Sequence, residues 1–146
     1  MNHPIGLECV LKDGQLKDML RWFAEKDYDV LVYDIYKIDN KSSIMPIGHK
    51  NISIHSSGLK EFFHSTIWEM VMYIYLPGAE KQAIDTYEDY VNSQCVGCVI
   101  YYDCGYLEVY TKDVPLLHEI DALASAWNVE EKSLITESNR RTIMHL

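Results

Sequence analysis

One segment of the chain, Trp68–Leu76 (WEMVMYIYL), is apolar at nearly every position and contains a single charged residue, Glu69. An apolar run of this kind is typical of a central strand that is covered on both faces of its sheet. It is far shorter than the roughly 20 residues that a membrane helix needs. Pro77 and Gly78 end it. A fold built around this strand therefore has to cover both faces of a sheet.

The residues after this strand alternate between helix and strand patterns. Thr86 and Asp89 have the spacing of a capping box, and Asp113 with Pro115 marks a later helix start. The expected elements are the strand from Trp68, a short helix from Thr86 to about Ser93, strands Val96–Asp103 and Tyr106–Thr111, a helix with an apolar stripe from Leu116 to Trp127, and strand Lys132–Glu137. This β-α-β-β-α-β order over residues 68–137 predicts a ferredoxin-like unit.

The first half of the chain adds a β-α-β pattern. Ile5–Leu11 is typical of a strand, Asp13 is placed to cap a helix with apolar residues at helical spacing, and Asp29–Ile38 is rich in Val, Ile and Tyr. Asp39–Ser43 (DNKSS) is a predicted loop, too short to separate domains. We therefore predict a single α+β domain (residues 1–146), with a mixed, largely antiparallel sheet and helices mainly on one face.

Thirteen basic and 22 acidic residues give a net charge of −9. This balance disfavours nucleic acid, whose phosphates need clustered Lys and Arg. It suits a basic protein partner, although it also simply favours solubility. The first residues, MNHPIGLECV, lack the basic start and the long apolar region of a signal peptide. We expect a cytoplasmic protein, monomer or homodimer, that binds no nucleic acid or membrane and keeps its cysteines reduced.

The motif Cys95-Val-Gly-Cys98 is the most obvious candidate for chemistry. A redox CxxC normally begins a helix, whereas here a predicted strand follows. In an extended strand, residues three apart point to opposite faces, so we predict that these thiols do not meet. A zinc site would have to add Cys104 and His118, without the paired spacing that such sites show. Small buried cysteines are the simpler interpretation, and no cofactor or metal is predicted.

The predicted hairpin offers a candidate binding surface. If Cys104-Gly105 is a two-residue turn, Tyr102 faces Leu107 and Ile100 faces Val109 on the core side. The opposite face then carries Val99 and the predicted partner-binding residues Tyr101, Asp103, Tyr106, Glu108 and Tyr110. Tyrosine is favoured in interfaces, and acidic neighbours suit a basic partner. The alternative is that helices cover both faces or that these tyrosines simply favour the strand.

Other groups carry weaker signals. His64 close to Glu69 could form an acid–base pair, although a surface or structural histidine is the simpler interpretation. The adjacent Arg140 and Arg141 could bind an anion, but they are more typical of ordinary charges on an exposed tail. The sequence contains no glycine-rich phosphate loop and no GxSxG motif.

Several short segments resemble a known family. They are Thr86-Tyr87-Glu88-Asp89-Tyr90, Ser93, Cys95, Tyr106, Tyr110, Lys112-Asp113, Ile135-Thr136-Glu137, Asn139 and Arg141-Thr142. With the strand and helix from Gly6 to Ala24 and the strand from Trp68, they are similar to a family of uncharacterised proteins, mainly from spore-forming Gram-positive bacteria, known as domain of unknown function 2691. The resemblance implies one compact intracellular domain and no particular activity.

These observations favour a non-enzymatic protein-interaction module, immunity-like or inhibitor-like, that uses the acidic, tyrosine-rich hairpin face. A small-ligand sensor of ferredoxin-like build is an alternative that an apolar pocket with convergent polar groups would favour. An enzyme that uses His64 or the cysteines is a further alternative.

Overall fold

The computed structural model describes residues 3–38, 44–47 and 52–146. The strands are β1 (Gly6–Val10), β2 (Asp29–Ile38), β3 (Ile44–Ile47), β4 (Ile52–His55), β5 (Thr66–Tyr75), β6 (Cys95–Tyr102), β7 (Tyr106–Thr111) and β8 (Glu130–Ile135). Within the described residues they form one eight-stranded sheet in the order β3-β2-β5-β6-β7-β1-β8, and β4 also pairs with β2. Every pair of these strands is antiparallel. The predicted α+β fold with a largely antiparallel sheet is confirmed.

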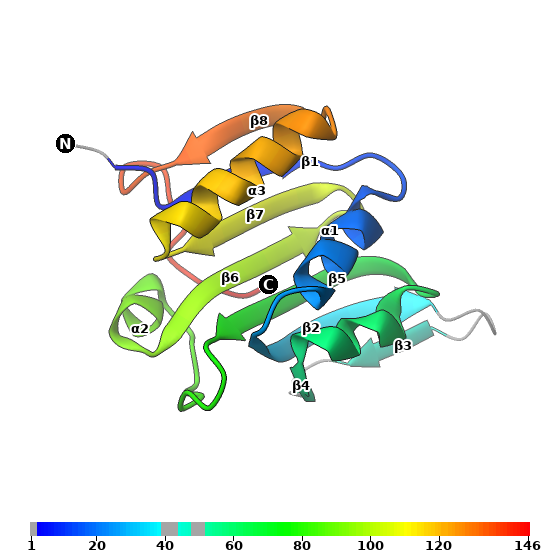
Figure 1. The fold of residues 1–146 in the computed structure, drawn as a ribbon, viewed down its shortest axis with the longest axis horizontal. Coiled ribbons are helices and arrows are strands. Elements are labelled where there is room, and N and C mark those ends of the chain that lie inside the picture. The colour runs from blue at the N-terminus through cyan, green and yellow to red at the C-terminus, as the bar shows by residue number, and fades with distance from the viewer. Residues whose placement is uncertain (1–2, 39–43, 48–51) are drawn as a thin grey trace.

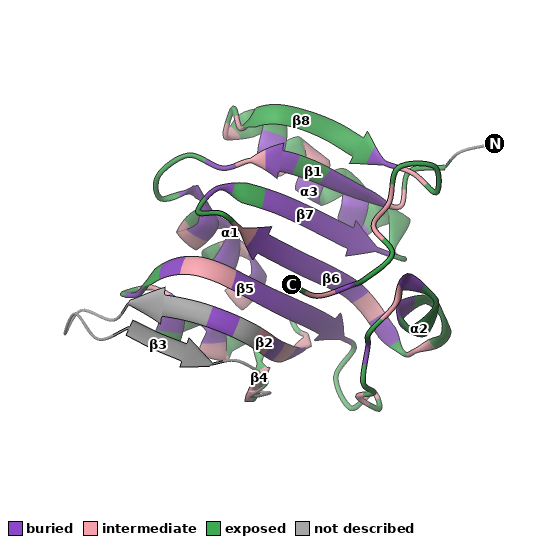
Figure 2. Ribbon diagram, turned by 180° about the vertical axis from the view of Figure 1, so that it is seen from behind, coloured by how far each residue is buried: buried purple, intermediate pink, exposed green. Residues whose placement is uncertain are grey.

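The helices lie mainly on one face of this sheet, as predicted. They are α1 (Gln15–Ala24), the 3₁₀ helix η1 (Ser56–Phe62), α2 (Tyr87–Asn92) and α3 (Val114–Ala126). Helices α1, η1 and α3 cover the side that faces the viewer in Figure 1, which we call the front face. The opposite side, the back face, is covered by α2, by the loop before it and by the C-terminal segment, which runs across the strands in Figure 2.

Strand β5 is covered on both faces, as its apolar sequence predicts. Alternate side chains belong to two separate apolar clusters. Those on the front are Met70, Met72 and Ile74, and those on the back are Val71, Tyr73 and Tyr75. Each of these six side chains is at most 2% exposed. The strand therefore holds together the two layers that cover the sheet.

The strand arrangement differs from the ferredoxin-like expectation. The chain order β5-α2-β6-β7-α3-β8 matches the predicted β-α-β-β-α-β order. However, β5 and β6 are direct antiparallel neighbours, and β8 pairs with β1. A ferredoxin-like unit would place another strand between the first two. The reason is length: α2 has six residues and spans about 9 Å, whereas the ten residues of β5 span about 33 Å. Helix α2 is too short to carry the chain back along the sheet for a crossover.

Two of the predicted helix caps are confirmed and one is wrong. Thr86 and Asp89 form both bonds of a capping box at α2, and the side chain of Asp113 accepts the amide of Leu116 at the start of α3. At α1, however, the N-cap is Gly14 in the left-handed region (φ 81°), and no side chain caps the helix. Asp13 therefore lies one residue before the N-cap and does not cap the helix as predicted. The predicted loop at Asp39–Ser43 lies outside the described residues.

Candidate functional site

The turn of the β6–β7 hairpin contains one more residue than predicted. Tyr102 pairs with Tyr106, so the connection is Asp103-Cys104-Gly105 and the predicted two-residue turn is wrong. Asp103 and Cys104 both take left-handed φ values (51° and 57°), and the amide of Gly105 donates to the carbonyl of Tyr102 at 3.2 Å. The carbonyl of Gly105 accepts the amide of Leu11 at 2.7 Å. This bond to the end of β1 holds Gly105 outside the β6–β7 pairing.

The extra residue divides the predicted binding surface between the two faces. The alternation predicted for β7 is correct, because Tyr106, Glu108 and Tyr110 share the back face. The alternation predicted for β6 is reversed: Tyr101 is 6% exposed and packs in the front core opposite Leu107, and Tyr102 takes its place on the back. Asp103 is exposed in the turn. The structure thus brings together three of the five predicted residues and adds Tyr102.

Glu108 is the centre of this back-face group. The residue is 8% exposed, and its carboxylate accepts the hydroxyl of Tyr110 at 2.8 Å and that of Tyr102 at 3.1 Å. Burial raises the pKa values of Tyr102 and Tyr110, and the nearby Glu108 carboxylate raises both values further. The hydroxyls therefore stay protonated and remain donors to Glu108. The guanidinium of Arg141 completes the group, with its Nε 3.7 Å from the carboxylate.

The two arginines near the C-terminus are bound to the back face, so the prediction of an exposed tail with ordinary charges is wrong. The amide of Arg141 donates to the hydroxyl of Tyr110 at 3.2 Å. Arg140 lies over the ring of Tyr87, 4.0 Å from its centroid, and its Nε donates to Glu137 at 2.9 Å. Ile143 forms a bridge with Thr86, and Met144 is fully buried. Apart from the Arg140–Glu137 bond, these contacts join residues far apart in the chain, so no local pattern in the sequence indicates them.

The two thiols of the CxxC motif lie on the same face, which corrects the prediction that they point to opposite faces. Tyr75 pairs with Cys95 and Ile74 with Gly97, so Val96 is an extra residue in β6 and shifts the alternation by one. Cys95 and Cys98 are both fully buried in the back cluster. Burial raises the pKa of Cys95 to about 11 and raises that of Cys98 well above its usual value. Both thiols are therefore protonated and unreactive at neutral pH.

Beside Glu108, an open hollow of about 320 Å³ lies over β7, β1 and β8 on the back face. Its polar lining consists of Glu8, Glu108, Glu131, Tyr102 and Tyr106, and we call it the acidic hollow. Glu8 is directly opposite Glu108 in the β1–β7 pairing, and it accepts the hydroxyl of Ser133 at 3.0 Å. The rings of Tyr102 and Tyr106 are stacked with centroids 5.6 Å apart.

Glu8 and Glu131 were not predicted as site residues, because the sequence does not show that β1 pairs with β7 and with β8. A signal for Glu8 was present, since it is the one charged residue of β1 and alternates with Leu7 and Cys9. That alternation places Glu8 on the polar side of its strand. Only the β1–β7 pairing, between residues about 100 apart, shows which carboxylate it faces.

The other sequence candidates do not converge. His64 is exposed in the turn after η1. In the part of the chain that the structure describes, no group of three His, Cys, Asp or Glu side chains is arranged to hold a metal ion. Across residues 3–38, 44–47 and 52–146, no helix combines the length and apolar character needed to span a membrane.

Several residues of the family resemblance lie close together on the back face. Tyr87, Tyr110, Glu137 and Arg141 belong to the contacts that bind the C-terminal segment to the back face. The ammonium of Lys112 bonds to the carbonyl of Ser93 nearby. A family model described as "Protein of unknown function (DUF2691)" matches residues 10–145. No curated protein and no solved structure matches the chain. The chain therefore belongs to the DUF2691 family of proteins of unknown function.

Proposed function

We propose that this protein is a non-enzymatic interaction module of the immunity or inhibitor type, whose acidic hollow receives a lysine or arginine side chain of a basic partner protein. The observation that carries the proposal is the pairing of Glu8 with Glu108 at the wall of the hollow. Like charges directly opposite each other on neighbouring strands are destabilising. A site that keeps such a pair is suited to bind a cation from outside.

The negative charges of Glu8 and Glu108 differ in how far other groups of the protein neutralise them. Glu108 is buried and has two hydroxyl donors and Arg141. Glu8 is exposed and has the neutral hydroxyl of Ser133, and Glu131 is exposed on the same hollow. An incoming ammonium or guanidinium group would therefore be attracted to Glu8 and Glu131. The net charge of −9 would also speed the encounter with a basic partner.

The tyrosines supply the contact area for such a partner. Tyr106 is 47% exposed, and its ring stacks on that of Tyr102. An aromatic ring next to carboxylates favours a cationic side chain, because the ring face attracts positive charge. Tyrosine also loses little conformational entropy on binding, since it has few rotatable bonds. The exposed part of the predicted surface thus retains the chemistry of an interface, with Tyr102 in place of Tyr101.

The test is affinity capture of partners from a lysate of the cells that make the protein, with quantitative mass spectrometry. Wild-type protein is compared with the double variant Glu8→Gln/Glu131→Gln. The recovered basic partner should bind the double variant about tenfold more weakly, because two exposed charge contacts are each worth up to about 1 kcal/mol.

The matched control removes the same two charges elsewhere. Glu25 and Glu61 are exposed and lie outside the acidic hollow, so Glu25→Gln/Glu61→Gln should leave the affinity of the partner unchanged. If both double variants bind the partner equally more weakly than wild type, the net charge alone drives binding and the acidic hollow is not the interface. If neither weakens it, the proposal fails.

A small-ligand sensor is the second candidate function. It is favoured by a separate hollow on the front face with convergent polar groups, among them Asp13, Lys17 and Tyr101.

A further inference from the structure

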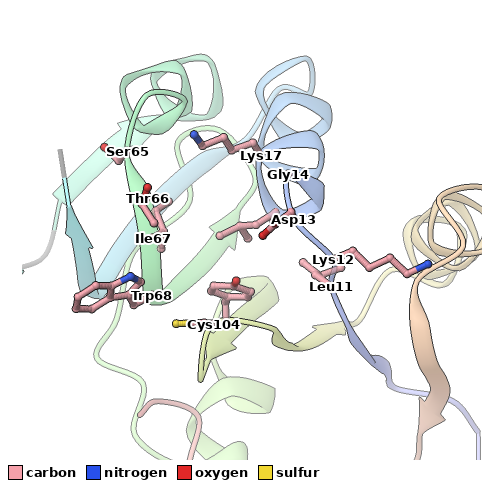
Figure 3. Close-up of a pocket in the computed structure, with 12 residues that line it drawn as sticks. Leu11, Lys12, Asp13, Gly14, Lys17, Ser65, Thr66, Ile67, Trp68 and Cys104 are labelled. Atoms are coloured by element: carbon pink, nitrogen blue, oxygen red, sulfur yellow. The ribbon is translucent and has the colours of Figure 1, made fainter. Parts of the chain in front are cut away.

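A second hollow, of about 350 Å³, opens on the front side of the molecule where the start of α1 meets the start of β5 and the hairpin turn. We call it the front hollow. Its lining is Leu11, Lys12, Asp13, Gly14, Leu16, Lys17, Ser65, Thr66, Ile67, Trp68, Tyr101 and Cys104. Figure 3 shows that these residues come from three separate parts of the chain. The volume is at the lower end of the range of about 300–1,000 Å³ for small-molecule sites.

Tyr101 is the residue that points to a ligand. Its side chain is 6% exposed, and its hydroxyl has no hydrogen-bond partner among the described residues. Among the described residues, the buried side-chain polar atoms without a hydrogen-bond partner are Tyr90 Oη and Arg141 Nε, so the unpaired hydroxyl of Tyr101 is accessible to solvent. Burial raises the pKa of this hydroxyl, and the neighbouring Cys104 and Asp13 raise it further. Cys104, Asp13 and Tyr101 itself all line the front hollow. The ring of Tyr101 is buried while its hydroxyl is open to the hollow, so this hydroxyl is free to bond to a polar group of a ligand there.

The start of α1 adds further donors at the same place. No side chain caps this ten-residue helix. The amides of Leu16 and Lys17 in its first turn have no acceptor in the described part of the chain. An uncapped helix start carries partial positive charge and favours an anion. The start of α1 can therefore bind a carboxylate.

The charged side chains of the front hollow have both signs. Lys17 is half-buried and, within the described residues, forms no ion pair; in Figure 3 it extends from α1 toward Ser65 and Thr66. Lys12 extends the other way, and its ammonium donates to the carbonyl of Asn128 at 2.8 Å. Asp13 is likewise without an ion pair among the described residues. A lone anion would be repelled by Asp13, and a lone cation by Lys17 and the start of α1.

We propose that the front hollow binds a small zwitterion of amino-acid size, with its carboxylate at the start of α1 beside Lys17 and Tyr101 and its ammonium group beside Asp13. The apolar part of the ligand would contact Leu11, Ile67 and the ring of Trp68. Such a site lies on the opposite side of the sheet from the acidic hollow and does not depend on the protein partner proposed above.

The test is isothermal titration calorimetry with each standard amino acid in turn, and then with the N-acetyl and the decarboxylated forms of the tightest binder. At least one amino acid should bind with a Kd below about 1 mM. Each modified form should bind about tenfold more weakly, because each lacks one of the two charges. If no amino acid binds at this level, or if a modified form binds as tightly as its parent, the proposal is wrong.

Three variants and a matched control locate the site. The affinity for the tightest-binding amino acid should fall about fivefold in each of Tyr101→Phe, Asp13→Asn and Lys17→Gln. This is the effect of one lost hydrogen bond or ion contact. Lys12→Gln removes the same charge as Lys17→Gln from a side chain that points away, and it should leave affinity within about twofold. Lys17 is partly exposed and forms no ion pair among the described residues, so its variant remains informative even where Tyr101→Phe perturbs folding. Equal loss in Lys12→Gln and Lys17→Gln would overturn the proposed position.

Discussion

The two faces of the sheet are built from different side chains. The front cluster consists almost entirely of aliphatic residues, Met and Phe from α1, η1, α3 and the sheet. The back cluster contains five buried tyrosines, which are Tyr73, Tyr75, Tyr87, Tyr90 and Tyr110. Aliphatic side chains need only be packed, whereas buried tyrosine hydroxyls are usually paired, although the hydroxyl of Tyr90 is buried without a partner. The front face therefore gives mainly stability, and the back face specifies which segments can cover it.

The hydroxyls of the back face show this specificity. Tyr73 donates to the carbonyls of Met144 and Ile84, at 3.1 and 3.4 Å, and Tyr75 donates to that of Gln82 at 3.3 Å. Tyr110 donates to Glu108, which is paired in turn with Arg141. These bonds join the loop before α2 and the C-terminal segment to the sheet. Chain segments without regular structure can thus cover a face that usually takes helices.

The largest expected effect comes from the front face. Phe23 on α1 is fully buried in the front cluster. Replacing it with alanine should lower the free energy of unfolding by about 3–5 kcal/mol, because the change removes a ring and leaves a cavity. Urea denaturation followed by circular dichroism measures this loss. A loss below about 1 kcal/mol would show that the front face is not the main source of stability.

A smaller effect is expected from the polar centre of the back face. Glu108→Gln should cost about 1–3 kcal/mol, because one tyrosine hydroxyl then faces an amide donor and Arg141 loses its ion pair. Urea denaturation gives the value. The matched control is Glu131→Gln, which removes an exposed carboxylate from the same hollow and should change stability by less than about 0.5 kcal/mol. Equal losses in the two variants would contradict the central role of Glu108.

The smallest expected effect is a pH dependence at α2. The amides of Thr86 and Asp85 donate to Asp89, and they hold the pKa of this carboxyl below its ordinary value. A depressed pKa contributes stability above the ordinary range of Asp, near pH 4, and this contribution is lost as the pH falls through the folded-state value. Asp89→Asn should therefore reduce the difference in urea midpoint between pH 7 and pH 3. A variant with the wild-type difference would contradict this assignment, and Glu25→Gln is the control.

Sequence predicted what local patterns determine. The strand from Trp68, the capping box at Thr86 and the cap at Asp113 depend on residues within a few positions of one another, and all three are confirmed. The register of the hairpin was wrong because the amide of Leu11, far away in the chain, bonds to Gly105. A shift of one residue in a strand exchanges its two faces.

The candidate site shows the same limit. The alternation of Tyr106, Glu108 and Tyr110 follows from β7 alone and was predicted correctly. Glu8 and Arg141 reach Glu108 from the two ends of the chain, and no local pattern in either segment indicates this contact. Sequence therefore identified the chemistry of the surface, and the structure was needed to show which residues share it.

The most direct test of the interaction proposal is a titration of ¹⁵N-labelled protein with an oligo-lysine peptide, followed by amide chemical shifts. The shifts should concentrate at Glu8, Tyr102, Tyr106 and Glu131, where the acidic hollow places two exposed carboxylates beside an aromatic pair. Shifts of similar size around Glu25 and Glu61, or no shifts at the acidic hollow, would contradict it.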